Sequence, residues 1–321
     1  MRRHALLATL LSLPISQVMA LPLVTVVESY HPENAWDKAY LQGIKSKLDG
    51  VAELQFIALD TKRLPTDEHL QQAALALEQI QRQPPAVAIL GDDAALALLG
   101  PKLSRMNIPS IFLGINANPE RYFDGAKLPS NVSGVLERPQ YKSSFALIRE
   151  LIPTARRILV LLDQDRSAAI LHDDIVQLKD AHVDVLMVAS IDEWKKSIHQ
   201  AAGKYDAVLV GTYQALVDEK TQQNIEADVV MKWTNTNSKV PLFGFWDFQV
   251  GRDATVGGAV IAGFEQGEVA GKMTKSQLQL PKQSQAIKQG STARLMLSRT
   301  LVERWKLSIP SAMQNRISWL P

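Results

Sequence analysis

The chain has 321 residues, of which 46% are hydrophobic and 21% charged, a composition typical of a soluble globular protein large enough for two domains. It has no cysteine, which excludes disulfides, thiolate metal sites and a cysteine nucleophile. Lys and Arg number 35 against 33 Asp and Glu, so the formal charge of +2 gives no electrostatic reason to expect nucleic-acid binding.

Residues 1–20 have the pattern of a secretory signal peptide. A basic start at 1–4 precedes an apolar run at 5–13, and Val18-Met19-Ala20 fits a cleavage site after Ala20. The alternative is an amphipathic first helix of the fold. No segment has the roughly 18 consecutive apolar residues that a membrane span needs. The sequence therefore predicts export to the periplasm without embedding in a membrane.

Residues 21–115 alternate compact apolar runs with segments whose apolar residues recur at helical spacing. The runs predict strands at 23–27, 54–59, 87–90 and 111–113, and the helical spacing predicts helices at 36–48, 67–80 and 94–103. This βαβαβαβ order is typical of a doubly wound parallel sheet.

A second series of similar size follows a Gly-, Pro- and Asn-rich join that contains a crossing strand at 131–136. Strands are predicted at 158–162, 183–188, 207–210 and 242–245, with helices at 143–151, 168–181 and 192–202 and a weaker helix at 217–230. The sequence thus predicts an α/β protein of two doubly wound parallel-sheet lobes.

The tail is too short to form a core of its own. Strand-like runs at 256–261 and 293–297, a helix at 266–278 and a helix ending near 305 are expected to join the two lobes, through a hinge that the chain crosses several times. We expect the first lobe to comprise 21–134 plus about 256–290, and the second 135–255 plus about 291–321.

Motifs of enzyme chemistry do not occur. The sequence has no phosphate-binding loop, no dinucleotide fingerprint after its first strand and no serine at nucleophile-elbow spacing. Its six histidines show no paired metal-ligand spacing. We therefore expect no catalytic residue, metal or cofactor. An exported α/β enzyme remains the least favoured alternative.

Ligands of open parallel sheets bind beyond the carboxyl ends of the strands, so the loops at those ends predict the site. Aspartates at a helix start also serve as N-caps, so Asp92 and Asp93 have a structural alternative, and Trp36 also fits a buried helix face. The predicted ligand-binding residues are Ser29, Tyr30, His31, Trp36, Gly91, Asp92, Asp93, Asn116, Asp163, Asp165, Thr212, Tyr213, Trp246 and Asp247.

Carboxylates outnumber cations in these loops, and aromatic rings lie among them. A cleft that closes over its ligand excludes water, and unpaired carboxylates there are costly. A small ligand that carries an amine or several hydroxyl donors would satisfy them, and an aromatic or sugar-like face would stack on the rings. A polyanion such as phosphate is disfavoured.

The order and spacing of four stretches resemble the type I periplasmic binding proteins, and within them the ABC-transporter substrate-binding group related to tryptophan- and tyrosine-binding components. The stretches are Ser29-Tyr30-His31-Pro32 with Trp36 and Gly43-Ile44; Asn131-Val132-Ser133-Gly134-Val135; Val240-Pro241-Leu242-Phe243-Gly244-Phe245 followed by Gly257-Gly258-Ala259-Val260, Gln266-Gly267 and Gly271-Lys272-Met273; and Ala293-Arg294-Leu295-Met296-Leu297 through Leu307-Ser308-Ile309-Pro310.

The resemblance implies two lobes that close on a small ligand and an ABC permease as partner. Sensory versions of this domain share the Tyr-His-Pro stretch, so a sensor kinase's periplasmic domain is the alternative partner. The chain departs from the group at Gly91-Asp92-Asp93, where a small hydroxyl residue and alanines are usual, and at Ser298, where Asn is usual. The identity of the ligand therefore does not carry over.

Overall fold

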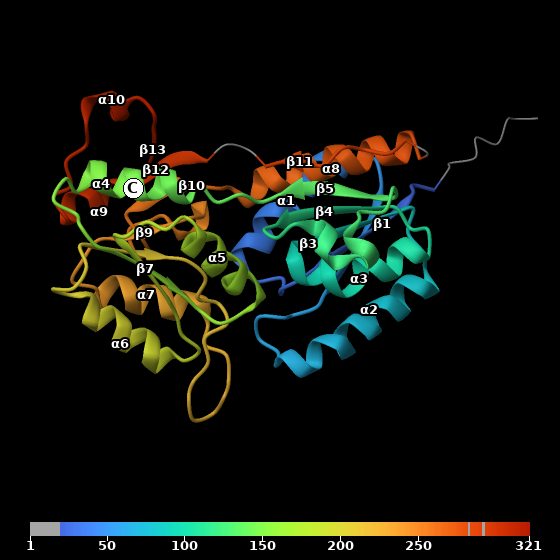
Figure 1. Cartoon of the computed structure of the whole chain (residues 1–321). Coiled ribbons are helices and arrows are strands. Elements are labelled where there is room, and N and C mark those ends of the chain that lie inside the picture. The colour runs from blue at the N-terminus through green and yellow to red at the C-terminus, as the bar shows by residue number, and fades with distance from the viewer. Residues whose placement is uncertain (1–19, 282, 291–292) are drawn as a thin grey trace, which may run out of the picture.

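A computed structural model describes residues 20–281, 283–290 and 293–321, so the predicted signal peptide lies almost wholly outside the described residues. The described chain forms two lobes, each built on one sheet (Figure 1). The strand orders are β11-β5-β4-β3-β1-β2 in the first lobe and β13-β12-β10-β9-β8-β6-β7 in the second. All pairings are parallel except that of β10 with β12.

Successive side chains of a strand point to opposite faces of its sheet. The apolar side chains of the first sheet are therefore covered by helices on both faces. On β1, Val24 and Val26 pack with α1, whereas Val27 packs with α2 and α3. The elements of this lobe are β1 (Leu23–Glu28), α1 (Ala35–Leu48), β2 (Glu53–Ala58), α2 (His69–Arg82), β3 (Val87–Gly91), α3 (Asp92–Arg105), β4 (Ser110–Ile115), β5 (Val132–Leu136), α8 (Gly263–Gln279) and β11 (Lys288–Gln289).

The second sheet repeats this arrangement. Val160 and Leu162 of β6 pack with α4 and α5, and Leu159 and Leu161 pack with α6 and α7. Its elements are α4 (Tyr141–Leu151), β6 (Ile158–Leu162), α5 (Arg166–Gln177), β7 (Val183–Met187), α6 (Ile191–Ala201), β8 (Ala207–Val210), α7 (Ala227–Asn237), β9 (Leu242–Gly244), β10 (Gly257–Val260), β12 (Arg294–Ser298), α9 (Arg299–Arg304), α10 (Ser311–Gln314) and β13 (Ile317–Leu320). Short 3-10 turns lie at Thr66–Glu68, Pro119–Tyr122, Asp124–Ala126 and Asp247–Gln249.

The chain passes between the lobes after β5, after β10 and after β11. The predicted α/β architecture of two parallel-sheet lobes is therefore confirmed. One expected lobe limit does not match the sheets: residues from about 256 were expected in the first lobe, but β10 pairs with β12 and β9 in the second. An apolar run in the sequence indicates a strand but not the strand with which it will pair, which explains this difference. The other limits stay predictions.

The predicted helix at 217–230 is wrong over its first ten residues. The carboxylate of Asp218 accepts hydrogen bonds from the backbone N–H groups of Lys220 and Thr221, and the Asn224 amide donates to the carbonyls of Gln214 and Leu216. Such local bonds between side chains and backbone compete with helix formation. The helix therefore begins only at Ala227.

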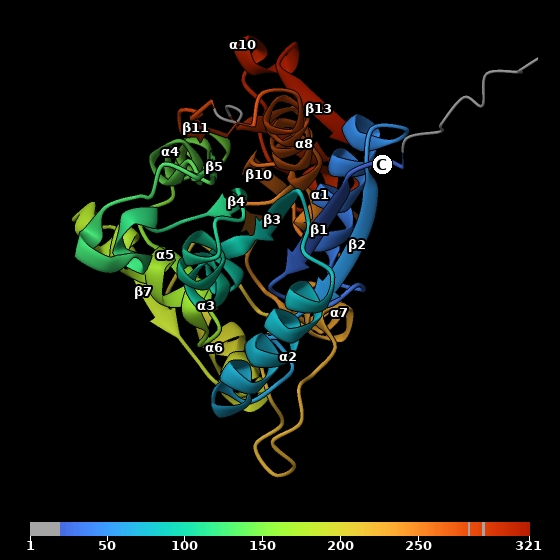
Figure 2. The same ribbon diagram turned by 90° about the vertical axis from the view of Figure 1, so that its right-hand side faces the viewer.

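Helices α1 and α8, which are far apart in sequence, lie side by side in both views (Figures 1 and 2). Their backbones approach closely at Gly267, where a Cβ atom would lie 1.9 Å from the carbonyl oxygen of Tyr40. This contact fixes α1, and with it Trp36 in its first turn, which lines the site described below. Among the described residues, no helix combines the length and the hydropathy of a membrane span.

We predict that Gly267→Ala lowers the free energy of unfolding by about 1–3 kcal/mol, because the added methyl group forces the two helix backbones apart. Lys275→Ala on the exposed side of the same helix is the control and should change it by less than about 0.5 kcal/mol. Urea unfolding followed by circular dichroism measures both. Equal stabilities of the two variants would contradict the close packing.

Candidate functional site

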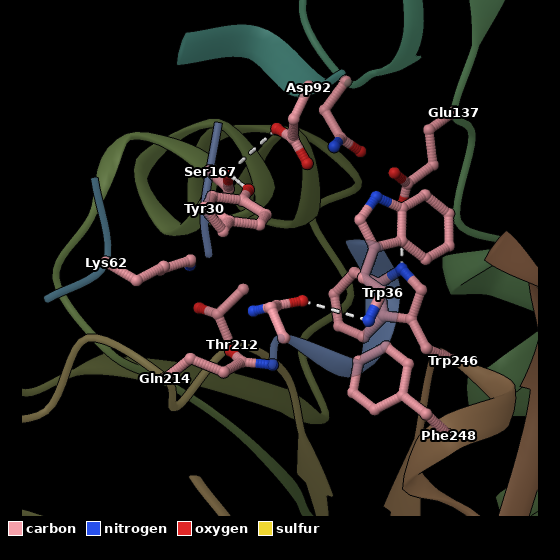
Figure 3. Close-up of a pocket in the computed structure, with 12 residues that line it drawn as sticks. Tyr30, Trp36, Lys62, Asp92, Glu137, Ser167, Thr212, Gln214, Trp246 and Phe248 are labelled. Atoms are coloured by element: carbon pink, nitrogen blue, oxygen red, sulfur yellow. Dashed lines mark hydrogen bonds between the residues drawn. The ribbon is translucent and has the colours of Figure 1, made fainter. Parts of the chain in front are cut away.

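A small cavity lies between the lobes, at the carboxyl ends of the parallel strands. Its volume is about 30 Å³. Figure 3 shows its walls, to which both lobes contribute. The lining residues are Tyr30, Asn34, Trp36, Lys62, Asp92, Asn116 and Glu137 from the first lobe and the hinge, and Ser167, Thr212, Gln214, Trp246 and Phe248 from the second.

Three hydrogen bonds join the lobes at the cavity. The hydroxyl groups of Tyr30 and Ser167 lie 2.9 Å apart, and the Ser167 hydroxyl also approaches Asp92 at 3.5 Å. The indole Nε1 of Trp246 donates to Glu137 at 2.6 Å. The lobes are thus held in a closed arrangement in which most of the site side chains are buried and Gln214 and Phe248 are half-buried.

A buried ion pair also joins the lobes. Lys62 follows β2 in the first lobe, and its Nζ lies 2.5 Å from Asp165 and 4.0 Å from Asp163, both of the second lobe. Burial lowers the pKa of Lys62, but the two carboxylates outweigh it and raise the pKa above its usual value. Lys62 therefore stays charged, and its charge is balanced by the protein itself.

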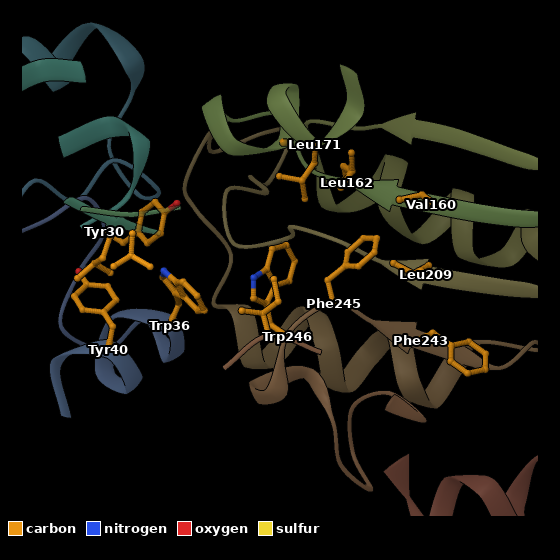
Figure 4. Close-up of a cluster of buried hydrophobic side chains, with 14 of the residues drawn as sticks. Tyr30, Trp36, Tyr40, Val160, Leu162, Leu171, Leu209, Phe243, Phe245 and Trp246 are labelled. Carbon is orange, nitrogen blue, oxygen red and sulfur yellow. The ribbon is translucent and has the colours of Figure 1, made fainter. Parts of the chain in front are cut away.

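Aromatic rings form the apolar wall. Trp246 and Phe248 stack with ring centroids 6.1 Å apart and planes at 16°. Trp36, held by α1, faces Trp246 across the junction of the lobes (Figure 4), and both belong to one cluster of buried apolar residues. Flat rings of this kind accept an apolar or aromatic body by stacking.

The carboxylates of the first lobe are short of compensating charge. Asp92 adopts a left-handed backbone conformation with φ 74°, which a non-glycine residue holds only where its surroundings impose it. Burial, together with the neighbouring carboxylate of Asp93, raises the pKa of Asp92 to about 7. Burial likewise raises the pKa of Glu137 well above its usual value. Both groups would be stabilised as anions by a bound cation.

A wider groove of about 580 Å³ lies beside the cavity and shares Tyr30, Lys62 and Ser167 with it. Its remaining lining comes mainly from the loop after β2 and the start of α5. Because the groove is open and the cavity is almost filled by side chains, separation of the lobes would join the two spaces.

Comparisons with known proteins agree with this geometry. The sequence pattern described as "ABC transporter substrate binding protein" matches residues 40–313. The chain belongs to the ABC transporter substrate binding protein family. No curated protein is significantly similar to this family member in sequence.

Solved structures similar to this substrate binding protein have the two-lobed fold of the type I periplasmic binding proteins. An ABC domain from Streptococcus pneumonia in complex with L-Trp gives a TM-score of 0.70 at 17% identity, over 94% of this chain and 100% of that one. A conserved domain protein from Vibrio cholerae gives 0.67 at 16%, over 94% and 99%. The ligand-free, open structure of a substrate binding protein from Clostridium difficile gives 0.62 at 12%, over 94% and 99%.

The structure of this substrate binding protein brings part of the predicted site together. The predicted residues that line the cavity are Tyr30, Trp36, Asp92, Asn116, Thr212 and Trp246. Trp36 and Asp92 had structural alternatives in the sequence, and the structure shows a structural role for each besides its place at the cavity: Trp36 packs in the core, and Asp92 accepts from the backbone N–H of Asp93. Whether these residues bind ligand stays a prediction.

The other predicted residues in the first lobe support the cavity from behind. The Ser29 hydroxyl accepts from the backbone N–H of Ala95 and donates to the carbonyl of Gly91. A Cβ at Gly91 would meet the Tyr40 hydroxyl at 2.5 Å. Asp93 accepts from the backbone of Asn116 and Ala117 and from Tyr122, and His31 bonds Glu33. None of these predicted residues belongs to the cavity lining.

In the second lobe, the predicted aspartates bond to protein groups. Asp163 accepts from the Thr212 hydroxyl and the backbone of Ala215, and Asp165 caps α5 at Ala168. Asp247 accepts from the backbone of Phe248, and Tyr213 packs against Trp194. Aspartate is favoured in such capping positions, and the loop sequence alone did not separate capping from ligand contact.

The sequence analysis missed Asn34, Lys62, Glu137, Ser167, Gln214 and Phe248. Asn34, Gln214 and Phe248 stand one or two residues from predicted positions, so a wider view of the same loops would have included them. Glu137 begins a lobe crossing directly after β5, a position that the strand-end rule also covers. Lys62 lies four residues beyond the end of β2, where no local pattern indicates burial.

We predict that the ligand-free protein becomes less stable as the pH rises from about 4 to about 7. The folded state holds the Asp92 proton up to a pKa of about 7, whereas the unfolded chain releases it near 3.8, so folding binds protons throughout this range. Urea unfolding at a series of pH values measures the slope. Asp92→Asn should flatten it, and Asp124→Asn, whose side chain is 96% exposed, should not. Identical slopes in all three proteins would contradict the assignment.

Proposed function

We propose that this protein captures a small solute bearing an amine or several hydroxyl donors between its lobes and delivers it to an ABC permease in the membrane. The observation that carries the proposal is the closed cavity in which Asp92 and Glu137 stand opposite aromatic rings. The family membership supports the solute-binding role itself.

The chemistry of the walls supports this kind of ligand. A buried carboxylate without a cation is costly, and charge-assisted hydrogen bonds from an ammonium group offset that cost. The rings of Trp36, Trp246 and Phe248 provide a surface for an apolar or aromatic part of the same molecule. Both features lie in one cavity, so a single small molecule can use them together.

The chain crosses between the lobes three times, and two rigid lobes can hinge about these crossings. Closing and opening about this hinge would capture and release the solute. A ligand that contacts both walls binds the closed form more tightly and so shifts the equilibrium toward it. The closed surface is then what a permease recognises. We place this process in the periplasm, because the predicted signal peptide at residues 1–20 and the family both favour export.

We predict that Lys62→Met leaves the ligand-free protein more open, because Asp163 and Asp165 would then lose their cation on closure, a loss that costs about 3–5 kcal/mol for a buried pair. Small-angle X-ray scattering should show a larger radius of gyration than for the unchanged protein. Arg63→Met is the matched control, since Arg63 is the adjacent cation but pairs with Asp60 and Glu33 of its own lobe. An unchanged radius in both variants would contradict a role of Lys62 in closure.

The proposed function is tested by the ligand that the protein carries. Native mass spectrometry of protein purified from its periplasm should show a non-covalent adduct, released unchanged on denaturation. Calorimetry with that ligand should show a loss of affinity of about 10- to 100-fold in Asp92→Asn and in Glu137→Gln. Glu78→Gln, an exposed change of the same kind on α2, should bind normally. Unaltered affinity in both site variants, or chemical turnover of the ligand, would refute the proposal.

Delivery needs a separate measurement. Ligand-loaded protein added to vesicles that contain its ABC permease should stimulate ATP hydrolysis more than the ligand-free protein does. Stimulation that does not depend on the ligand would argue against delivery while leaving ligand capture intact.

A further inference from the structure

Three oxygen-bearing side chains stand in a row at the edge of the first sheet. Asp92 follows β3, Asn116 follows β4 and Glu137 follows β5, and these strands are direct neighbours in the order β5-β4-β3. Neighbouring strands lie roughly 4.8 Å apart, so the three residues begin from adjacent points of one edge. All three line the cavity, and each is at least nine-tenths buried.

The middle member of the row has an acceptor with no partner. The Oδ1 atom of Asn116 is buried and takes part in no hydrogen bond, whereas its amide nitrogen donates to the carbonyl of Gly114. A buried acceptor left unpaired costs free energy comparable to the loss of a hydrogen bond. It therefore calls for a donor from the ligand, at the point between the two carboxylates.

Two cations close to this row, Lys62 and Arg138, already have partners in the protein. Lys62 pairs with Asp165 and Asp163. The guanidinium group of Arg138 donates to the backbone carbonyls of Ile115, Asn116 and Ala117 and to its neighbour's. Within the described residues, the salt bridges include no cation paired with Asp92 or Glu137.

Free N–H groups at the start of a helix suit an anion. Around the cavity, side chains of the protein already accept hydrogen bonds from such groups. Asn34 accepts from the first amides of α1, and Asp165 accepts from an amide of α5. At the start of α3, Asp92 and Ser29 accept from the amides of Asp93 and Ala95. At these positions a ligand carboxylate would meet side-chain oxygen atoms, two of them from carboxylates, that already accept from these N–H groups.

One buried donor in the cavity lacks a partner, the indole Nε1 of Trp36. A single neutral donor suits a hydroxyl, ether or carbonyl oxygen. It does not offset the burial of a carboxylate next to Asp92 and Glu137, since a buried anion needs a cation and further hydrogen bonds.

We infer that the ligand is a primary amine without a carboxylate, whose ammonium group donates its three hydrogens to Asp92, Asn116 and Glu137 while its body lies against Trp36 and Trp246. This inference rests on the proposed function and narrows it. A primary ammonium supplies three N–H donors, one for each member of the row. A zwitterionic amino acid would bring the same ammonium group together with an anion, and the one cation in the cavity lining, Lys62, is already paired with Asp165 and Asp163.

The test compares molecules that differ only in the carboxylate. Calorimetry on protein freed of bound ligand by reversible unfolding would use the pairs tryptamine and tryptophan, tyramine and tyrosine, and ethanolamine and serine. In the pair that fits the cavity best, we expect the amine to bind at least about 10-fold more tightly than the amino acid. An amino acid that binds as tightly as its amine, or more tightly, would overturn the inference.

Asn116→Leu separates a role in binding from a role in folding. The variant keeps the size of the side chain but removes the unpaired oxygen, so the primary amine should bind about 10-fold more weakly. The N,N,N-trimethylated amine, which has no N–H to donate, should bind the variant and the unchanged protein equally. An equal loss for both molecules would show a general disturbance of the cavity and would overturn the role given to Asn116.

The ligand isolated from the native protein distinguishes this inference from the function on which it rests. An isolated amine without a carboxylate supports both. A bound ligand that carries a carboxylate overturns the inference and leaves solute capture intact. If no adduct is found and no member of any pair binds, the proposed function fails, and the inference fails with it.

Discussion

The cost of removing carboxylates from water governs how the two lobes meet. Parallel strands bring their carboxyl ends to one edge, and two such edges face each other across the hinge. Asp92 and Glu137 arrive from one side, and Asp163 and Asp165 from the other. Closure is tolerable only where each of these charges finds a cation, a hydrogen-bond donor or a proton.

The carboxylates of the two lobes have different partners. The two aspartates of the second lobe share one cation, Lys62 from the first lobe, and also accept hydrogen bonds from Thr212 and from backbone amides. On the first lobe, Glu137 accepts from Trp246 and Asp92 accepts from Ser167, and among the described residues neither carboxylate takes part in a salt bridge. This asymmetry separates the contacts that hold the lobes together from the groups that we propose bind a solute.

The residues that line the cavity are held in place by the elements around them. Trp36 is fixed by the packing of α1 against α8, which depends on the missing side chain at Gly267. Asp93 ties the loop after β4 to the start of α3, and Ser29 ties the end of β3 to the same helix. Side chains at the cavity are thereby tied to the elements of their own lobe, and the lobes can move as units about the crossings.

The sequence by itself determined the two βαβ series, the absence of enzyme motifs and the loops that form the cleft, because hydrophobic periodicity and strand-end position are local properties. It also placed Tyr30, Trp36, Asp92 and Trp246 at the cavity. Only the tertiary structure decided which aspartates have a cation beside them: Asp163 and Asp165 share Lys62, a residue about a hundred positions away in the chain. The tertiary structure also decided that β10 joins the sheet of the second lobe and that Glu137 is buried. Both depend on partners that folding brings together and not on neighbours in sequence.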